Sequence, residues 1–595
     1  MKRILPLALA ALLAGAAGAH AQTRYTSAQR AADSTQALAF FRGNIAAIHR
    51  RDRPAYLRHY LQSPRLARVG PGGAQYGYEG FSSGPNSWPD TLMATHFEVV
   101  PLAPGVVYGV YRYRVVQGGS QRGVSERVMV RQPDGNWKVG VSTAFGSPRD
   151  APVPAFALTH ATVIDGTGRP PLLDATVVMR GGKVECVGAC PVEPDVEVID
   201  ARGRWIVPGL VDAHVHYSQT GWADGRPDAL DVRQRFPYDS TVAALEAQPE
   251  RFYRSHLCSG VTATFDVGGY PWTWALRARA EASNAAPHVA AAGPLLSTID
   301  HWVNVPAARQ FVFTGSDSAT LAGARMMVAN RSDAIKVWYL AEQTSPDTAA
   351  FQARLRIAAA EARRGNIPLI VHATDLWQAK DALRAGARLL VHSVDDRPVD
   401  DEFIALAKRA GATYNPTLTV TDGYLMLYGR RWDPTGVAMQ CVDPDTRRKA
   451  ALTDSLPGAL PEARLAAFRQ RLATQRQTMY ANLRRVRDAG IPIAMGTDAG
   501  NPLTLHGASV YREMEAMVEA GMTPMEVLVA STRTAARAMG RADIGTLEPG
   551  KLADLVVLDA DPLASVGNFR RVRLVARGGE IWTREELEYP AAGGR

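Results

Sequence analysis

The sequence predicts an α/β protein in which a (β/α)8 TIM barrel is inserted into a small split β-sandwich and is preceded by an α+β domain. Three observations lead to this fold class. Apolar runs alternate with helical stretches over residues 208–543. Short strands with glycine turns flank that region, over 156–207 and 544–595. Residues 25–147 show another order, helices followed by alternating strands.

Length and composition indicate a globular protein of several domains. A chain of 595 residues is too long for a single hydrophobic core. Its 46% hydrophobic and 21% charged residues are ordinary for a folded protein. The net charge of +9 is spread along the chain without a block of lysine or arginine. We therefore expect no nucleic-acid partner.

The N-terminus has the pattern of a secretory signal. Lys2 and Arg3 precede an apolar run, Ile4–Ala14, and the small-residue motif ends at Ala21. This predicts a signal peptide over 1–21 that is cleaved after Ala21, and an exported protein whose expected compartment is the periplasm. An uncleaved anchor is the alternative. No later stretch is long and apolar enough to predict a membrane span.

The four cysteines are too few for a disulfide scaffold. Cys186 and Cys190 lie four residues apart on a predicted strand, where they would face the same way at long range. We therefore expect them to remain unpaired. Cys258 and Cys441 are interpreted as isolated thiols in the core or in loops.

Residues 25–147 predict a small α+β domain. Apolar residues recur with helical spacing from about Ser27 to Leu61, and the period then changes to two over Val106–Val115. Another strand is expected over Glu126–Gln132, and the turn at 133–136 predicts a hairpin.

This order of elements resembles the ketosteroid-isomerase-type (SnoaL-like) cone domain. A cone of this type can be an enzyme with a carboxylate base in its mouth, and Glu79, Glu98 and Glu126 are available for that role. Nothing in the sequence marks one of them as buried. A binding or assembly module, which could serve a homo-oligomer, is the favoured interpretation.

A proline-rich linker at 148–155 leads into short strands with glycine turns. Similar strands return at the far end of the chain. A sheet divided in this way implies that the insert is a compact domain of its own. The predicted strands lie at Phe156–Ile164, Ala175–Arg180, Val184–Val187, Val196–Asp200, Trp205–Val207, Leu555–Asp559 and Val572–Trp582.

Eight strand-like runs separated by helical patterns predict the barrel. The last helix has a clear start, with Thr523 as N-cap, Pro524 at the first position and Glu526 completing a capping box. The runs are Leu210–His216, Val261–Asp266, Val289–Ala292, Ala334–Tyr339, Leu369–His372, Leu389–His392, Ala412–Asn415 and Ile491–Thr497.

Metal-binding residue types follow four of these runs. His214 and His216 end the first run, and residues i and i+2 of a strand point the same way. His372 and His392 end the fifth and sixth runs, and Asp498 follows the eighth. Active sites of this fold lie at the carboxyl ends of the strands. The pattern predicts a metal centre there.

Lys336 lies in the middle of the fourth run. A lysine that points into a barrel is costly to bury as a free cation. After reaction with CO2 its carbamate would be an anionic ligand able to bridge two metal ions.

The motifs PGLVDAHVH, DAIKVW, VHA, VHS, MGTDAG and GTLEPGKLADLVVLD are specific. In them the chain resembles the amidohydrolase superfamily, and within it the imidazolonepropionase-like and Xaa-Pro dipeptidase-like metal-dependent hydrolases. The resemblance covers about residues 156–585. It implies a metal-bearing barrel with a flanking split sandwich.

The resemblance also implies two divalent metal ions, with zinc as the best match to imidazole and carboxylate ligands. His214 and His216 would bind the first metal. His372 and His392 would bind the second. Lys336, as a carbamate, would bridge the two.

Asp498 would bind the first metal and act as the acid/base. A hydroxide between the metals would attack a carbonyl carbon, because metals lower the pKa of bound water to about 7. This implies an exported hydrolase of carbon–nitrogen bonds in an amide, peptide or cyclic amide, with a small-molecule substrate. A net site charge of +1 (+4 from the metals, −3 from carbamate, carboxylate and hydroxide) would favour an anionic intermediate.

The chain departs from the dipeptidase-like pattern at two places; His301 keeps the histidine of the first, and the second argues against carboxylate recognition and so against dipeptidase activity. The third strand is followed by Thr298–His301 in place of Gly-Gly-His, and Thr374 occurs where relatives often have a tyrosine. Candidate substrate-binding residues on loops after barrel strands are Tyr270, His301, Trp302, Tyr339, Thr374, Trp377, Asn415 and His506.

Three alternatives remain open at this stage. A lactone, ester or carbamate hydrolase could use the same site. A non-catalytic small-ligand binding protein could keep the barrel, although the presence of Asp498 and Lys336 argues against it. The chemistry could also belong to the N-terminal domain, with a degenerate barrel.

Overall fold

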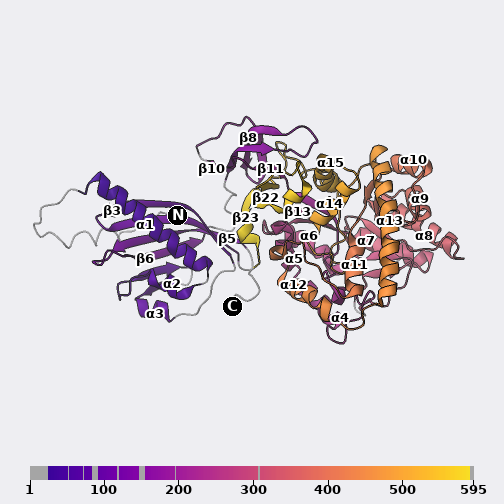
Figure 1. Cartoon of the computed structure of the whole chain (residues 1–595), viewed down its shortest axis with the longest axis horizontal. Helices are drawn as coiled ribbons and strands as arrows, with labels where there is room; N and C mark the ends of the chain where they lie inside the picture. The colour runs from indigo at the N-terminus through magenta and orange to yellow at the C-terminus, as the bar shows by residue number, and fades with distance from the viewer. Residues whose placement is uncertain are drawn as a thin grey trace, which may run out of the picture. The chain divides into compact units, whose positions relative to one another are not determined.

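The structure is a computed structural model that describes residues 25–589 except 51, 71–72, 84–90, 117–119, 147–154, 195 and 306–307. The predicted signal peptide and most of the predicted linker lie outside these residues. The chain divides into two compact units, Met1–Ala151 and Pro152–Arg595 (Figure 1). Among the described residues, every helix is too short or too polar to cross a bilayer.

The N-terminal unit is a six-stranded sheet with helix α1 (Ser27–His49) lying over its strands (Figure 1). Thr26 caps α1 in a capping box with Gln29. The strand order is β2-β1-β6-β5-β4-β3, antiparallel except for the β1–β6 pair. The other elements are α2 (Arg53–Arg58), β1 (Ala67–Gly70), β2 (Gly73–Tyr76), α3 (Tyr78–Ser82), β3 (Thr91–Ala103), β4 (Val106–Val116), β5 (Ser120–Arg131) and β6 (Trp137–Gly146).

The core of this unit forms where α1 meets the sheet. The ring of Phe41 lies 5.3 Å from the rings of both Phe97 and Tyr111. Gly109 allows this approach, because a Cβ there would be 2.9 Å from the Phe41 ring. The predicted hairpin at 133–136 joins β5 to β6. The sequence analysis did not predict β1, β2 or β3, and the cone-type identity of the unit stays a prediction.

The second unit contains a sheet built from both of its ends. β11 (Trp205–Pro208) pairs antiparallel with β21 (Leu555–Leu558), so residues about 350 positions apart share one sheet. The order is β23-β22-β21-β11-β7-β8-β9, with β10 also on β7. The remaining strands are β7 (Phe156–Val163), β8 (Leu172–Arg180), β9 (Lys183–Gly188), β10 (Glu197–Asp200), β22 (Val572–Arg577) and β23 (Glu580–Thr583).

Parallel strands between these halves form the barrel. Two runs of pairing, β12-β13-β14 and β15-β17-β18-β19-β20, meet at residues 292–294, where the third strand is broken. Backbone bonds from Tyr414 to Pro492 (2.8 Å) and from Ala213 to Met495 (3.1 Å) close the ring through the eighth segment. The strands are β12 (Leu210–Val215), β13 (Val261–Asp266), β14 (His288–Ala291), β15 (Leu295–Ser297), β17 (Ile335–Trp338), β18 (Leu369–His372), β19 (Leu389–Val391) and β20 (Thr413–Asn415).

The α/β fold class is thus confirmed, with two differences in detail. Gly293 and Pro294 interrupt the third strand, and β16 (Phe311–Phe313) adds to β15. The eighth run is held by isolated bridges rather than a continuous ladder. The helices are α4 (Tyr238–Ala247), α5 (Arg251–Cys258), α6 (Trp274–Glu281), α7 (Asp317–Ala329), α8 (Thr348–Arg364), α9 (Leu376–Ala385), α10 (Asp401–Ala410), α11 (Val420–Gly429), α12 (Pro444–Ala451), α13 (Glu462–Asp488), α14 (Val510–Glu519), α15 (Pro524–Val529), α16 (Ala535–Ala538) and α17 (Arg584–Leu587).

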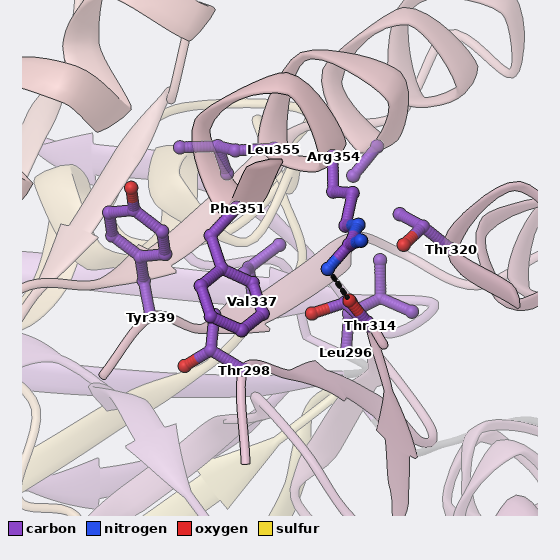
Figure 2. Close-up of a pocket in the computed structure, with 10 residues that line it drawn as sticks. Leu296, Thr298, Thr314, Thr320, Val337, Tyr339, Phe351, Arg354 and Leu355 are labelled. Atoms are coloured by element: carbon purple, nitrogen blue, oxygen red, sulfur yellow. Dashed lines mark hydrogen bonds between the residues drawn. The ribbon is translucent and has the colours of Figure 1, made fainter. Parts of the chain in front are cut away.

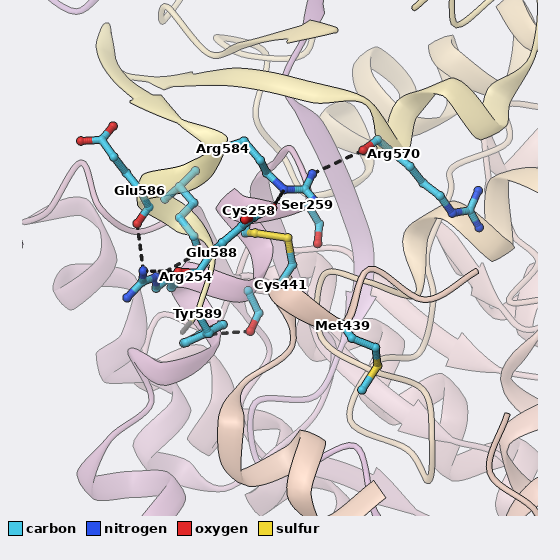
Figure 3. The surroundings of a disulfide bond; sticks show 12 residues. Arg254, Cys258, Ser259, Met439, Cys441, Arg570, Arg584, Glu586, Glu588 and Tyr589 are labelled. Carbon is cyan, nitrogen blue, oxygen red and sulfur yellow. Dashed lines mark hydrogen bonds and ion pairs between the residues drawn. A yellow bond between two sulfur atoms is a disulfide. The ribbon is translucent and has the colours of Figure 1, made fainter. Parts of the chain in front are cut away.

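The expectation of four unpaired cysteines is wrong. Cys186 and Cys190 form a disulfide with their Cα atoms 5.9 Å apart, because β9 ends at Gly188 (φ 112°) and the chain turns back. Cys258 at the end of α5 is bonded to Cys441, 183 residues later (Figure 3). This second bond ties the insertion after β20 to α5.

Candidate active site

His214 and His216 lie on the same side of β12 and face Asp498. The distance from Asp498 Oδ1 is 3.2 Å to His214 Nε2 and 3.0 Å to His216 Nε2. All three side chains are buried, and their ligand atoms lie within 4.8 Å of one another. This is the geometry of a candidate metal site with two imidazoles and one carboxylate.

The outer nitrogens of both imidazoles are already engaged. His214 Nδ1 lies 3.2 Å from the amide oxygen of Asn415, and His216 Nδ1 lies 2.6 Å from the carbonyl oxygen of Gly268. An oxygen acceptor at Nδ1 favours the tautomer with its proton there, which leaves Nε2 as a free lone pair. Asn415, predicted to bind substrate, instead orients a histidine.

His372 and His392 join the same group. Their ring centroids are 4.3 Å apart, and the His392 ring lies 5.0 Å from that of His214. His392 Nδ1 is held 2.7 Å from Thr417 Oγ1. The structure therefore brings the four predicted histidines together from β12, β18 and the end of β19.

Burial lowers the pKa of His214, His372 and His392 and keeps these three imidazoles uncharged, which is the form that binds metals. It lowers the pKa of His214 to about 4 and that of His372 to about 3. Burial also lowers the pKa of Lys336 to about 8, although Asp498 and Asp266 oppose the shift. Lys336 is only 2% exposed on β17, next to the strand that carries His372.

Two members of the group have an unusual backbone. Asp498 has φ 63° and His392 has φ 74°, in the left-handed region that non-glycine residues rarely adopt. The amide of Asp498 donates to the carbonyl of His214 (2.8 Å), which fixes this turn. Such conformations concentrate at functional sites, where the surrounding structure offsets their cost.

The donor atoms at the centre lack other partners. In the part of the chain that the structure describes, His214 Nε2 and Asp498 Oδ1 are buried and make no hydrogen bond. Buried polar atoms are almost always satisfied, and a cation between them would satisfy both. The residues therefore fit a metal ion, and the mixed imidazole–carboxylate set suits zinc.

Two of the predicted substrate residues pack near Trp338, which lies beside this group. His301 stacks on Phe311 with centroids 4.4 Å apart and lies 5.4 Å from the Trp338 ring, which is itself 6.1 Å from the His372 ring. Tyr270 is fully buried, and its hydroxyl lies 3.0 Å from that of Tyr238.

Other predicted substrate residues do not face the histidines. Tyr339 follows Trp338 on the opposite side of the strand and donates to Asp381 of α9 (2.8 Å). Figure 2 shows it beside Phe351 and Leu355 of α8, in a pocket outside the barrel. Its ring also lies 5.8 Å from that of Trp377.

The other candidates have packing or backbone contacts. His506 stacks on Phe252 at 3.9 Å and bonds to the carbonyl oxygen of Gln219 at 3.0 Å. The amide of Thr374 donates to Gln378. Trp302 is 58% exposed. None of these contacts involves a predicted ligand.

Residues 205–581 match the model of the amidohydrolase family. The chain belongs to this family. Imidazolonepropionase of Streptomyces avermitilis is 27% identical over 482 residues, covering 78% of this chain and 99% of that protein. Imidazolonepropionase of Geobacillus kaustophilus is 39% identical over 109 residues, or 18% of this chain and 26% of that protein.

A solved structure shares the fold of this amidohydrolase. A Xaa-Pro dipeptidase with bound methionine in its active site superposes with a TM-score of 0.55 at 21% identity, covering 72% of this chain and all of that one. The prediction of an enzyme of the hydrolase class acting on carbon–nitrogen bonds is confirmed by the family match and these relatives.

Two buried carboxylates hold the backbone next to the proposed metal ligands, and the sequence analysis did not identify them. Asp212 accepts from Thr497 N (3.0 Å) and Oγ1 (2.6 Å), which ties the first strand to the eighth. Asp266 accepts from Tyr217 N (3.0 Å) and Gly268 N (3.1 Å). An acidic residue inside an apolar run was the signal for both.

A second missed group lies near Asp498 on the loops. Arg226 binds Asp228 through two hydrogen bonds, of 2.8 and 2.7 Å, and also donates to Asn501. Asn501 accepts from Tyr424 (2.7 Å) and donates to the backbone carbonyl of Asp498 (3.1 Å). These residues come from two loops and from helix α11 with no shared motif, so no local pattern could identify them.

Asn415→Leu is expected to lower metal affinity about 10- to 100-fold, because it removes the acceptor that orients His214. Competition with a chelator measures the affinity. Tyr339→Phe is the matched control, since its hydrogen bond lies on the far side of β17, and its affinity should equal that of the wild type. Wild-type affinity in Asn415→Leu would contradict a positioning role.

Proposed function

We propose that this chain is an exported, metal-dependent amidohydrolase that cleaves the carbon–nitrogen bond of an amide, a peptide or a cyclic amide. The observation that carries the proposal is the convergence of His214, His216 and Asp498 with His372 and His392 at one end of the barrel. The relatives named imidazolonepropionase and Xaa-Pro dipeptidase support this substrate class.

In this proposal two divalent metal ions bind, with zinc as the expected metal. His214, His216 and Asp498 would hold one ion, and His372 with His392 would hold the other. Lys336, as a carbamate, would be a ligand common to both. When bound, the metals supply an activated water and polarise the carbonyl oxygen of the substrate.

The chain itself contributes positioning and proton transfer. Asp498 Oδ1 faces the centre of the imidazole group, so it can accept a proton from the attacking water and pass it to the leaving nitrogen. A metal ion would bind Asp498 in its carboxylate form, which is also the form that can accept a proton. Asn415 and the Gly268 carbonyl hold the two imidazoles in place.

Two features support export. The pattern over 1–21 is that of a signal peptide. Both cysteine pairs are within bonding distance, and disulfides persist in oxidising compartments.

The enzyme loaded with zinc in the presence of bicarbonate should hydrolyse members of a panel of amides, dipeptides and cyclic amides. A chelator should abolish turnover, and zinc should restore it. Esters, lactones and carbamates with the same acyl groups form the comparison panel. Turnover confined to that panel would contradict the proposed bond specificity.

A truncated chain beginning at Pro152 should hydrolyse the same substrates with kcat/KM within about twofold of the full chain. All proposed ligands belong to the second unit, which has its own hydrophobic cores. Steady-state kinetics on both proteins provides the comparison. A truncated chain that folds but turns over far more slowly would place part of the chemistry in the N-terminal unit.

A further inference from the structure

Three rings form a connected cluster beside the proposed metal ligands. Trp338 follows Lys336 by two residues on β17, so both side chains lie on the same side of that strand. The Trp338 ring lies 6.1 Å from the His372 ring. It also lies 5.2 Å from the Phe311 ring and 5.4 Å from the His301 ring. We call Trp338, Phe311 and His301 the aromatic cluster.

Part of this cluster and the neighbouring His372 remain open to solvent. Trp338 and His372 are both partly exposed, whereas Val337 and Val371, the residues before them on their strands, are almost completely buried. The side chain of His301 is 10% exposed. An apolar group bound next to His372 would cover the exposed part of the Trp338 ring, and burial of aromatic surface favours binding.

An arginine–aspartate pair connects this cluster to Asp498. Asp228 Oδ2 lies 3.8 Å from His301 Nε2. Nε and Nη2 of Arg226 hold the two oxygens of Asp228 at 2.8 and 2.7 Å. Nη1 of Arg226 donates to Asn501, whose amide nitrogen donates to the backbone carbonyl of Asp498 at 3.1 Å. The side chains of Arg226 and Asp228 are 19% and 16% exposed, so the pair is accessible to a ligand.

Asp228 occupies the donors that would otherwise bind a substrate carboxylate. Arginine pairs preferentially with a planar carboxylate through two parallel hydrogen bonds. In Arg226 both of these donors already hold Asp228, and the pair is neutral as a whole. A second carboxylate beside Arg226 would have to displace Asp228 or lie next to its negative charge, and a contact between like charges is unfavourable.

The same aspartate acts against an anion at His301. Because Asp228 Oδ2 lies 3.8 Å from His301 Nε2, an anion bound there would also meet the charge of Asp228. Thr374 agrees with this, since it stands where dipeptidase-like relatives often have a tyrosine that faces a substrate carboxylate. Arg226, His301 and Thr374 thus all disfavour a free carboxylate on the substrate.

We propose that this enzyme selects uncharged amides that carry an aromatic group close to the scissile bond, and that it discriminates against substrates with a free carboxylate. The aromatic cluster contacts the ring of the substrate. Asp228 neutralises Arg226 and repels an anion. The inference rests on the proposed amide hydrolysis and narrows its substrate class, since dipeptides end in a free carboxylate.

Two matched pairs of amides test the effect of the carboxylate on the full chain, loaded with zinc in the presence of bicarbonate. N-phenylacetylpyrrolidine and N-phenylacetylproline carry the ring on the acyl side. Acetanilide and 4-acetamidobenzoate carry it on the nitrogen side. The members of each pair differ only in one carboxylate. In at least one pair, kcat/KM should be at least about tenfold higher for the neutral member. A smaller ratio in both pairs would overturn the proposal.

Asp228→Asn should weaken this discrimination, because it removes the negative charge and leaves Arg226 free to bind an anion. The ratio of kcat/KM for the neutral over the carboxylated amide should fall at least about tenfold. Asp231→Asn is the matched control, because Asp231 pairs with Arg233 at 2.6 Å on the same loop and its loss changes the net charge equally. This control should keep the wild-type ratio. An unchanged ratio in folded Asp228→Asn would overturn the role of Asp228, and the wild-type ratio decides if that variant does not fold.

Trp338→Leu tests the contact with the substrate ring. The preference for the better ring-bearing amide over N-acetylpyrrolidine, which has no ring, should fall at least about fivefold. Trp377→Leu is the matched control, because its ring lies 5.8 Å from that of Tyr339, on the outer side of the barrel. It should keep the wild-type preference. Equal preference in the wild type and in Trp338→Leu would contradict the role of the aromatic cluster.

Titration calorimetry separates failure of this inference from failure of the proposed function. If the zinc-loaded protein hydrolyses none of these amides, the proposed function is contradicted, and binding decides the inference. The wild type should then bind the neutral member of one pair at least about tenfold more tightly than the carboxylated member, and Asp228→Asn should remove the difference. Hydrolysis without preference for the neutral member would overturn the inference alone. Binding of no member of either pair would overturn both.

Discussion

Asp498→Asn is expected to lower kcat/KM by at least about 10³-fold while leaving the fold intact. The carboxylate is the proposed proton carrier, and general acid–base catalysis alone contributes about 10²–10⁴-fold. Its Oδ1 also faces His214 and His216 at 3.2 and 3.0 Å. An amide keeps the shape but cannot take the proton or supply the negative charge. Steady-state kinetics and circular dichroism measure the two parts of this prediction.

Asp381→Asn is the matched control for that variant. Asp381 lies on α9 and accepts from Tyr339, on the outer side of the barrel. Its replacement should change kcat/KM by less than about twofold. His372→Ala should lose turnover as Asp498→Asn does. A wild-type rate in Asp498→Asn or in His372→Ala would refute the proposed site.

Lys336→Met is expected to reduce the metal content from about two ions to about one per chain and to lower kcat at least about 10²-fold. The carbamate is the proposed bridge between the ions, and methionine keeps the length and apolar stem of lysine without the nitrogen. The buried position should tolerate this change, because no cation then has to be buried. Elemental analysis of protein purified with bicarbonate gives the metal content.

The wild type and the variant must be compared under the same loading conditions. Equal metal content of about one ion in both would show that Lys336 is not a bridge, and would favour a mononuclear enzyme. A wild type that binds no metal even after reconstitution would favour a small-ligand binding protein instead. Lys551→Met serves as a control, because Lys551 lies outside the barrel and pairs with Glu548.

The sequence identified most of the metal-ligand candidates because strand geometry is local. His214 and His216 are two residues apart on a strand, so their common direction follows from the period of the strand alone. His372 and His392 end apolar runs, and barrel strands bring such ends together. The family match then confirmed the fold and the enzyme class.

Substrate candidates were less predictable because their direction depends on contacts far away in the chain. Trp338 and Tyr339 are neighbours in the sequence. The Trp338 ring lies 6.1 Å from the His372 ring, whereas the Tyr339 hydroxyl donates to Asp381 on the outer side of the barrel. Asn415 was found, but its role as an acceptor for His214 was not. No periodic sequence pattern surrounds Arg226, so the sequence analysis did not identify it.

The sequence by itself determined the alternation of strands and helices in the barrel, the division of the flanking sheet and the residues that end the barrel strands. Each follows from periodicity or from a motif within a few residues. Only the tertiary structure decided the Cys258–Cys441 bond, the closure of the barrel through residues 491–497 and the contact of Asn415 with His214. These features depend on which distant segments pack together, and packing is a property of the whole chain that no local pattern encodes.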